Sequence, residues 1–581
     1  MRRVLIALAL LVMPSASASA EVLALCAEGQ KAYNAGSYGL AIAEFSRCLE
    51  SDELSSGNRA FIHYKRGRAH DYTSDTDRAI ADFTEALRLD PEYVTARNYR
   101  GIAYHEKGDF DKAIADFTEA LRLDPEYVVA HNRRGMAHRK KGDFDEAIAD
   151  YTEALRLDPK YVPAYNNRGN IYRRRGDYDR AIADYDRALH LNADYIKGYQ
   201  NRGFAYRLKG DLERAISDYD RVLELDPDNA GNYYGRGIAY NKVGDFDRAI
   251  ADFTDALRLD PMHVNARNYR GIAYHDKGDL EKAIADYTEV LRLDPAYVHA
   301  YNNRGNVYRD RGEYDRAIAD YDRALHLNAD YARGYGNRGF AYRLKGDLER
   351  AILDYDRVLD LDPDDAKTYY SRGIAYHKNN DLQRAILDYD RAIEINSNYV
   401  KAYSRRALAY YDKGEHDKAI ADYTEALRLK PDSAYAYNNR GRTYNEKGDH
   451  DKAIADFTEA LRLKPESAYA YAGRGRAYYD KGDRDKAIAD FTEALRLNPE
   501  SAYAYNGRGR AYNDKGEHDK AIADYTEALR LKPDSAYAYA GRGKAHYDKG
   551  NSVLAISNYI QVLLLKFDNL KAYFDRPPPI E

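Results

Sequence analysis

The chain has 581 residues, of which 32% are charged, and 90 Lys and Arg against 95 Asp and Glu give a formal net charge of −5. A mean hydropathy of −0.77 is typical of disordered chains, but 58 Tyr and 14 Phe are more aromatic residues than such chains carry. The balanced charge gives no reason to expect a nucleic-acid partner, which normally requires a basic surplus. No apolar run is long enough to cross a bilayer as a helix, so we expect no membrane-spanning helix.

Residues 1–20 have the pattern of a secretory signal peptide. Two arginines follow Met1, the apolar segment 4–13 is too short to cross a bilayer, and Ala18 to Ala20 fit the small-residue cleavage rule. We therefore expect the mature chain to begin at Glu21 and to reside in the bacterial periplasm. The alternatives are an uncleaved N-terminal anchor and a misassigned start.

The sequence contains two cysteines, Cys26 and Cys48, which lie close together near the start of the mature chain. An even pair this close together in an exported chain predicts a disulfide. In the chain-entropy description such a bridge stabilises the fold by about 3 kcal/mol. The alternative is two buried free thiols.

A regular repeat organises almost all of the remaining sequence, with a period of about 34 residues. Fifteen consecutive units run without insertion over residues 60–569, and an irregular unit with four extra residues precedes them at 21–59. Residues 570–581 follow as a short stub and a proline-rich tail. Repeats of this length indicate stacked helical units that must bury one another's apolar faces. The length alone would suggest roughly four domains, but the repeats predict one array.

Each unit reads as two helices joined by a tight turn. In the unit that begins at residue 94, Ala96 belongs to the apolar stripe of a first helix, and a second stripe begins at Ala113. Gly108 lies between the two, where the end of a helix favours a left-handed residue. Pro125 then ends the second helix. Helices of about 13 residues are marginal alone, so neighbouring units are needed for stability.

The pattern small-Tyr-x-x-x-Gly-x-x-Tyr, then Ala-x-x-x-Phe/Tyr-x-x-Ala and then Pro, resembles the tetratricopeptide repeat. The resemblance covers almost the whole mature chain. It implies an all-α, right-handed superhelical solenoid of about 16 helix-turn-helix units. It also implies that first helices line a concave groove and that second helices cover the convex side. Such arrays usually bind peptides or proteins.

One feature departs from the family pattern. Arg takes the place of a large apolar residue one position before the first-helix Gly position in all fifteen regular units. Sixteen residues later an Asp follows in fourteen of them, and Asn558 replaces it in the last. We expect one Arg–Asp ion pair between the two helices of each unit, because a partly buried Arg requires a carboxylate. The alternative is a row of arginines that faces a ligand.

First-helix residues that avoid the packing stripe are expected to face the groove. An Asn side chain both donates and accepts, so a row of asparagines can pair with an extended peptide backbone. In the C-terminal units Tyr and Arg recur at two further positions and predict a basic, aromatic end. The groove candidates are Asn98, Asn132, Asn166, Asn167, Asn201, Asn268, Asn302, Asn303, Asn337, Asn438, Asn439, Asn506, Tyr435, Tyr469, Tyr503, Tyr537, Arg442, Arg476 and Arg510. The alternative is a solvated polar face without a ligand.

No motif supports catalysis. The sequence contains no Gly-rich phosphate loop, nucleophile elbow, His-Glu-x-x-His or Cys-x-x-Cys pattern. Histidines that share a repeat position lie a whole repeat apart, so they cannot converge on a metal ion. We therefore expect no enzyme, no cofactor and no metal.

The sequence thus predicts a binding scaffold of the bacterial cell envelope that holds proteins or extended peptides in its groove. The alternative is an envelope protein that assists polysaccharide synthesis or export, with Tyr and Arg side chains that meet sugars. RNA binding through a helical-repeat code is disfavoured by the acidic mature chain and the export signal. The apolar last unit is expected either to be capped by its stub or to form a homodimer.

Overall fold

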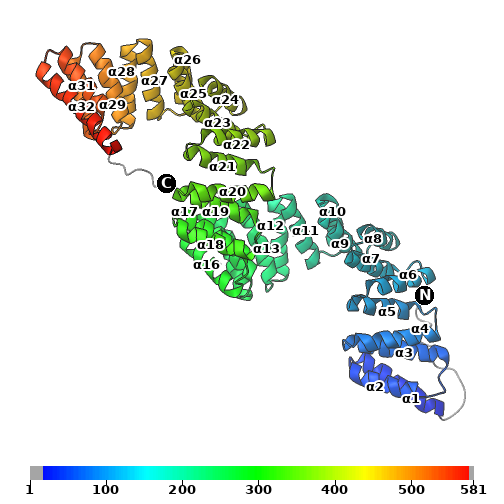
Figure 1. Cartoon of the computed structure of the whole chain (residues 1–581). Coiled ribbons are helices and arrows are strands. Elements are labelled where there is room, and N and C mark those ends of the chain that lie inside the picture. Colours follow the sequence, from blue (N-terminus) through cyan, green and yellow to red (C-terminus); the bar gives the residue numbers. More distant parts are fainter. Residues whose placement is uncertain (1–17, 575–581) are drawn as a thin grey trace. The chain divides into compact units, whose positions relative to one another are not determined.

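Pairs of antiparallel helices follow one another along the chain (Figure 1). The computed structural model describes the backbone of residues 18–574 and the side chains of residues 26–565, and this part of the chain contains 32 helices and no strand. Most of the expected signal peptide and the proline-rich tail lie outside the described residues. The segment Ala18 to Ala20 forms the first turn of α1. In the described part, no helix is long and apolar enough to cross a bilayer.

The helices alternate between first and second members of a hairpin. The first helices are α1 (Ala18–Asn34), α3 (Ser56–Tyr72), α5 (Val94–Lys107), α7 (Val128–Lys141), α9 (Val162–Arg174), α11 (Ile196–Lys209), α13 (Ala230–Val243), α15 (Val264–Lys277), α17 (Val298–Asp310), α19 (Ala332–Lys345), α21 (Ala366–Lys378), α23 (Val400–Asp412), α25 (Ala434–Lys447), α27 (Ala468–Lys481), α29 (Ala502–Asp514) and α31 (Ala536–Asp548). The second helices are α2 (Tyr38–Leu49), α4 (Thr76–Leu89), α6 (Phe110–Leu123), α8 (Phe144–Leu157), α10 (Tyr178–Leu191), α12 (Leu212–Leu225), α14 (Phe246–Leu259), α16 (Leu280–Leu293), α18 (Tyr314–Leu327), α20 (Leu348–Leu361), α22 (Leu382–Ile395), α24 (His416–Leu429), α26 (His450–Leu463), α28 (Arg484–Leu497), α30 (His518–Leu531) and α32 (Ser552–Phe574).

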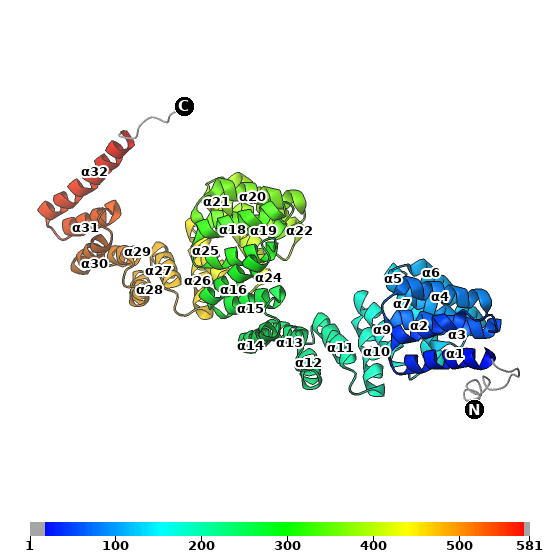
Figure 2. The ribbon, with the colours of Figure 1, turned by 90° about the horizontal axis from the view of Figure 1, so that it is seen from below.

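The chain divides into two units, residues 1–293 with α1 to α16 and residues 294–581 with α17 to α32. Within each unit, every second helix except the last packs between its own first helix and the first helix of the next hairpin (Figure 2). Consecutive first helices also contact each other, whereas no second helix in the described residues contacts the next second helix. First helices are therefore the more closely spaced, and they lie on the inner side of each stack. The all-α solenoid predicted from the sequence is confirmed.

Glycine allows the two helices of a hairpin to approach closely. A Cβ on Gly101 would lie 2.8 Å from the ring of Phe117, which is fully buried. Gly108 ends the first helix at φ +88°, in the left-handed region that favours glycine. Glycine recurs at the repeat positions of Gly101 and Gly108 in most repeats, so most hairpins have the same short distance between their helices and the same turn.

All fourteen expected Arg–Asp pairs are present between the helices of a hairpin. Arg440, for example, donates from Nε and Nη2 to the two carboxylate oxygens of Asp456, each at 2.8 Å. Such a two-point contact satisfies the planar guanidinium and the carboxylate together. In the last hairpin Arg542 donates to the side-chain oxygen of Asn558 at 2.8 Å.

The same arginines also reach the preceding hairpin, which the sequence did not predict. Nη1 of Arg440 donates to Oγ1 of Thr424 at 3.0 Å, so one side chain connects α24, α25 and α26. Elsewhere the acceptor is an Asp, as for Arg406 and Asp390 at 2.6 Å. Because the bond crosses from one repeat to the next, it fixes how consecutive hairpins stack.

The first hairpin lacks this arginine and contains a disulfide instead. Glu28 and Glu44 stand at the two positions and pair with their helix neighbours Lys31 and Arg47. Cys26 on α1 is joined to Cys48 on α2, with a Cα–Cα separation of 5.3 Å. A covalent bond therefore connects the two helices in the unit that has no ion pair between them.

The C-terminal end differs from the expected separate stub. Residues 570–574 continue α32, and Phe567 stands where most of the other repeats have a helix-ending proline. Val553, Ile556 and Leu563 are exposed on this helix, since no further first helix packs against it within the described residues. The homodimer through this end stays a prediction.

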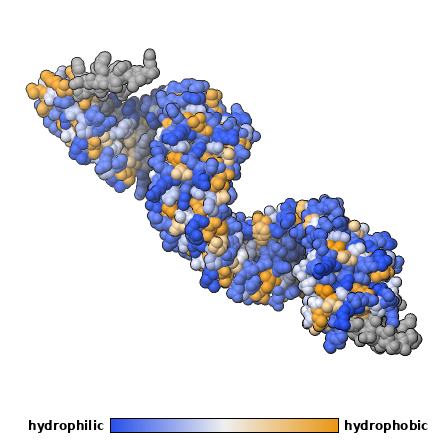
Figure 3. Space-filling view, turned by 60° about the horizontal axis from the view of Figure 1, so that its bottom comes forward, coloured by the Kyte–Doolittle hydropathy of each residue, from blue (hydrophilic) through white to orange (hydrophobic). Residues whose placement is uncertain are grey.

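Most other charges lie on the solvent-exposed surface. In Figure 3 hydrophilic residues cover most of the visible face, with apolar residues scattered among them. A typical pair joins Arg428 to Glu425 one helical turn away, at 2.6 Å. Exposed pairs of this kind contribute about 0.3–0.5 kcal/mol each, whereas removing one partner of a buried pair leaves an uncompensated charge and costs about 3–5 kcal/mol.

We predict that Arg440→Ala destabilises its hairpin by about 3 kcal/mol, because Asp456 is left as a buried charge without its partner. Hydrogen exchange of the full chain measures this as faster exchange of α25 and α26. Asp456→Asn should cost less, since Asn558 shows that an amide oxygen also accepts from the arginine.

Arg462→Ala is the matched control, because Arg462 pairs with Glu459 on the exposed face of the same hairpin. The free energy of local unfolding that exchange reports for this variant should match that of the unaltered chain within about 0.5 kcal/mol. Equal effects of Arg440→Ala and Arg462→Ala would contradict a structural role for the arginine between the helices.

Candidate functional site

Four C-terminal first helices present tyrosines on the side that faces away from the second helices. Tyr435, Tyr469, Tyr503 and Tyr537 occupy the second residue of α25, α27, α29 and α31, and each is 48–55% exposed. A serine precedes each helix as its N-cap, and its hydroxyl accepts from a backbone N–H in the first turn, as Ser467 does from Ala470 at 3.3 Å. The cap fixes the first turn and therefore the direction of the tyrosine.

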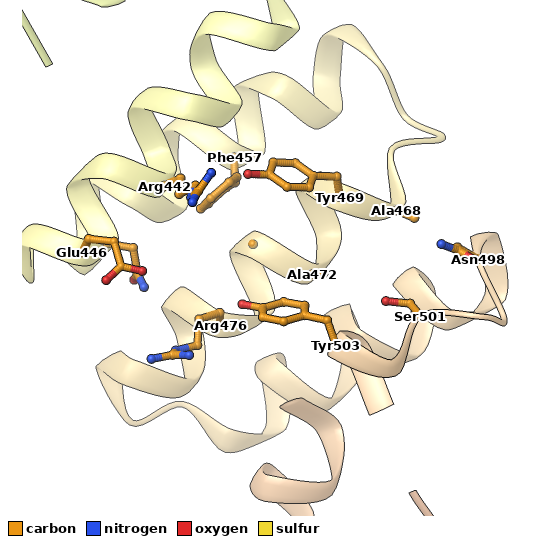
Figure 4. A pocket seen from close by; sticks show the side chains of 12 residues that line it. Arg442, Glu446, Phe457, Ala468, Tyr469, Ala472, Arg476, Asn498, Ser501 and Tyr503 are labelled. Atoms are coloured by element: carbon orange, nitrogen blue, oxygen red, sulfur yellow. The ribbon is translucent and has the colours of Figure 1, made fainter. Parts of the chain in front are cut away.

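A cavity of about 580 Å³ opens between these helices (Figure 4). Its lining comes from α25, α26, α27, the turn before α29 and α29 itself. The lining residues are Arg442, Asn445, Glu446, Phe457, Ala468, Tyr469, Ala472, Gly473, Arg476, Asn498, Ser501 and Tyr503. We call this space the larger pocket.

Aromatic rings form the walls and the floor of the larger pocket. Tyr469 and Tyr503 lie on successive first helices, and their hydroxyl ends point toward Arg442 and Arg476 (Figure 4). The ring of Phe457 lines the pocket although only 2% of this core side chain is exposed, and Gly473 packs directly against it. A Cβ at Gly473 would lie 2.5 Å from that ring. The space therefore depends on small residues in α27.

The two arginines at the rim differ in their partners. Arg442 lies over the ring of Tyr411 at 4.3 Å, and no acidic side chain in the described residues forms an ion pair with it. Burial alone would lower the pKa of Arg442, but Tyr469 and Tyr411 raise it above its usual value, so the guanidinium stays charged. Arg476 is paired with Asp480 at 2.5 Å. The groove is thus less basic than the sequence predicted.

A second cavity, of about 320 Å³, lies one repeat further along. It is lined by Arg476, Tyr479, Phe491, Ala502, Tyr503, Asn506, Gly507, Arg510, Lys532, Ser535 and Tyr537. We call this space the smaller pocket. Its construction repeats that of the larger one, with Gly507 packed against Phe491 as Gly473 is packed against Phe457. Tyr503 and Arg476 line both pockets.

The smaller pocket is positively charged. Its lining includes Arg476, Arg510 and Lys532, but Arg476 is paired with Asp480 and the hydroxyl of Tyr479 donates to Asp514, so the positive charge comes from Arg510 and Lys532. Arg510 lies over the ring of Tyr479 at 4.6 Å, as Arg442 does over Tyr411. Burial opposes the charge of Arg510, but Tyr537 and Tyr479 raise its pKa. A cationic pocket with aromatic walls suits an anionic group.

The structure corrects the prediction that a row of asparagines faces the groove. Many of these amides bond to each other: Asn166 accepts from Asn201 at 2.8 Å, and Asn302 accepts from Asn337 at 2.8 Å. Asn132 and Asn167 form the same pair at 3.0 Å. The side chains of Asn98, Asn132, Asn166, Asn268 and Asn302 are buried. These amides stabilise the contact between consecutive first helices, so they are not free to bind a peptide backbone.

Glycine interrupts this asparagine ladder in the C-terminal repeats. Asn166 accepts from Asn201, which lies 35 positions later in the chain. The residue at the same offset from Asn438 is Gly473, and the one at the same offset from Asn506 is Gly541. The amide oxygens of Asn438 and Asn506 consequently have no hydrogen-bond partner among the described residues. The remaining candidates are half-buried, and Asn439 donates to the backbone oxygen of Tyr435 at 2.8 Å. Of the asparagine candidates, Asn506 lines a pocket.

Sequence reasoning missed the residues that create the pockets. Phe457 and Phe491 lie on second helices and read as core positions, and Ala472, Gly473 and Gly507 read as small packing residues. The available signal was the run of Gly at one repeat position in the last three units, where eleven of the twelve earlier regular units have a larger side chain and Gly235 is the exception. Such a loss of volume next to a core ring indicates either tighter packing or an opening.

The described residues contain no group of three or more His, Cys, Asp and Glu side chains that could hold a metal ion. The arrangement instead consists of stacked hairpins with an inner surface of aromatic and charged side chains. This architecture defines the class of helical-repeat scaffolds for protein interaction.

The sequence profile of tetratricopeptide repeats matches residues 64–128, 132–196, 234–298, 404–468, 473–536 and 514–569. Related repeat profiles match residues 203–244, 286–319, 305–344, 341–380 and 366–399. The chain belongs to the tetratricopeptide repeat family.

Solved structures similar to this chain are other repeat proteins. MamA is 32% identical over 29% of this chain and 93% of its own, with a TM-score of 0.28. A tetratricopeptide repeat protein from Parabacteroides merdae ATCC 43184 is 24% identical over 43% of this chain and 98% of its own, with a TM-score of 0.38. Yeast Tom70 is 19% identical over 75% and 96%, with a TM-score of 0.35. No curated protein matches the chain.

We predict that Gly507→Ala destabilises α28 and α29 by about 1–3 kcal/mol, because the new methyl group would overlap the ring of Phe491. Gly336→Ala is the control, since its nearest neighbour would be a methyl group of Val358 at 3.9 Å. That change should stabilise α19 by about 0.5–1 kcal/mol. Hydrogen exchange measures both, and equal effects would contradict the close glycine–aromatic contact.

Proposed function

We propose that the protein is a non-catalytic scaffold of the bacterial cell envelope that binds proteins through extended peptide segments. The binding surface is the row of first helices α25, α27, α29 and α31. The observation that carries the proposal is the pair of consecutive pockets, which open on the same face and share Tyr503 and Arg476. A ligand that occupies both must run across successive repeats, as an extended chain does.

The composition of the pockets supports a peptide ligand. Tyrosine and arginine are enriched among the residues that dominate binding energy at protein interfaces. Here both types stand on helices that are already ordered, so little conformational entropy is lost when a ligand binds. The half-exposed tyrosines also provide flat faces that suit sugars, and polysaccharide binding is therefore the second outcome that the experiment below distinguishes.

Two features support a location in the cell envelope. The N-terminal sequence has the pattern of a secretory signal peptide. The disulfide between Cys26 and Cys48 belongs to a class of bond that persists in oxidising compartments such as the periplasm. The proposed site of action is therefore the periplasm.

The test is affinity capture from an envelope fraction by the full mature chain, followed by mass spectrometry. We expect protein partners that are lost with Tyr503→Ala, since Tyr503 lines both pockets. Tyr72→Ala is the control, because Tyr72 is similarly exposed on the first helix α3 but lies outside the proposed binding surface. Partners that are insensitive to Tyr503→Ala, or capture of glycans alone, would contradict the proposal.

A further inference from the structure

We propose that the two pockets recognise two different side chains of one extended peptide. The larger pocket receives a bulky apolar side chain, and the smaller pocket receives an acidic side chain a few positions along the same peptide. This inference rests on the proposed function and specifies its ligand.

The larger pocket is built for an apolar group. Its floor is the ring of Phe457 and its walls are Tyr469 and Tyr503, while Ala472 leaves the centre open. Burial of an aromatic or large aliphatic side chain against these rings is favourable by about 25 cal/mol for each Å² removed from water. Glu446 stands at the rim and disfavours an acidic ligand there.

The linings of the two pockets differ at three positions that correspond by repeat, and at the first of them Tyr479 takes the place of Asn445. Asn506 takes the place of Ala472, and the pocket that contains both larger side chains has a volume of about 320 Å³ in place of about 580 Å³. Lys532 replaces Asn498, which adds a positive charge. With Arg510 and without a carboxylate among the described lining residues, this pocket complements a negative group. An acidic side chain of short reach fits both the charge and the reduced volume.

The distance between the pockets follows from the geometry of the array. The first helices α27 and α29 are in contact, and helices in contact lie about 8–10 Å apart. An extended peptide advances about 3.3 Å per residue. One repeat therefore corresponds to about three residues of the ligand.

The shared wall between the pockets indicates that one ligand occupies both. Tyr503 and Arg476 separate the two spaces, and Arg476 is held in place by its ion pair with Asp480. Asn445 also donates to Asp480, at 3.1 Å, so the partition is anchored to the preceding helix. A fixed partition gives the two side chains a defined spacing.

The experiment measures binding of a library of extended peptides to the full mature chain by fluorescence anisotropy. In the library one position varies in apolar size and the position three residues before or after it varies in charge. We expect the tightest binding for Phe, Leu or Met at the first position together with Asp or Glu at the second. Affinity should fall with rising salt, because an exposed charge contact is screened.

Exchange of the residues that distinguish the pockets tests the assignment directly. Ala472→Asn introduces the side chain that a sister repeat already contains, and it should lower the affinity for bulky apolar residues about tenfold or more. Lys532→Ala should reduce the preference for acidic residues and the salt dependence. Lys464→Ala is the control for it, because Lys464 has the same repeat position but lines neither pocket.

The outcomes separate this inference from the proposed function. Peptides that bind without preference at the two positions, but lose binding with Tyr503→Ala, would overturn the inference and leave the peptide-binding groove in place. Preferences that Ala472→Asn and Lys532→Ala leave unchanged would also overturn it. Binding that is unaffected by Tyr503→Ala would contradict the groove itself.

Discussion

A single arginine in each regular repeat holds the array together. Its guanidinium makes a two-point contact with an aspartate on the other helix of its own hairpin, and in most repeats it also donates to the second helix of the hairpin before. Much of the cost of burying such a charge is offset because each of the three guanidinium nitrogens of Arg440 donates to an oxygen. Since the contact repeats in nearly every unit, consecutive hairpins stack in the same way throughout each half of the chain.

The regular frame allows the inner surface to change without altering the fold. Arg440, Arg474 and Arg508 keep their contacts in the repeats that form the pockets. The residues that vary lie on the opposite side of the first helices. There, Ala472 and Asn506 set the volume of the two pockets, and glycine takes the place of the asparagine donors that connect first helices elsewhere. The Arg–Asp contacts are therefore the same in repeats with and without a pocket.

The sequence was sufficient to predict the fold and the Arg–Asp pairs, because both depend on patterns that recur once in every repeat. It was a poorer guide to the groove. Asn166 and Asn302 were expected to face a ligand, but an amide at that position meets an asparagine of the next repeat at 2.8 Å. That contact joins two repeats and depends on the spacing of first helices, which no single repeat specifies. Phe457 and Phe491 were missed as pocket-lining residues for the same reason, because each ring lies against a glycine of the next hairpin.

The central claim is that recognition occurs on the C-terminal first helices and not along the whole array. Hydrogen exchange of the mature chain with and without a bound peptide tests it most directly, because the backbone amides of each first helix are measured separately. The account predicts that added protection is confined to α25, α27, α29 and α31, with α9, α11 and α13 unchanged. Protection that appears on α9, α11 and α13, or that is spread evenly over all first helices, would contradict it.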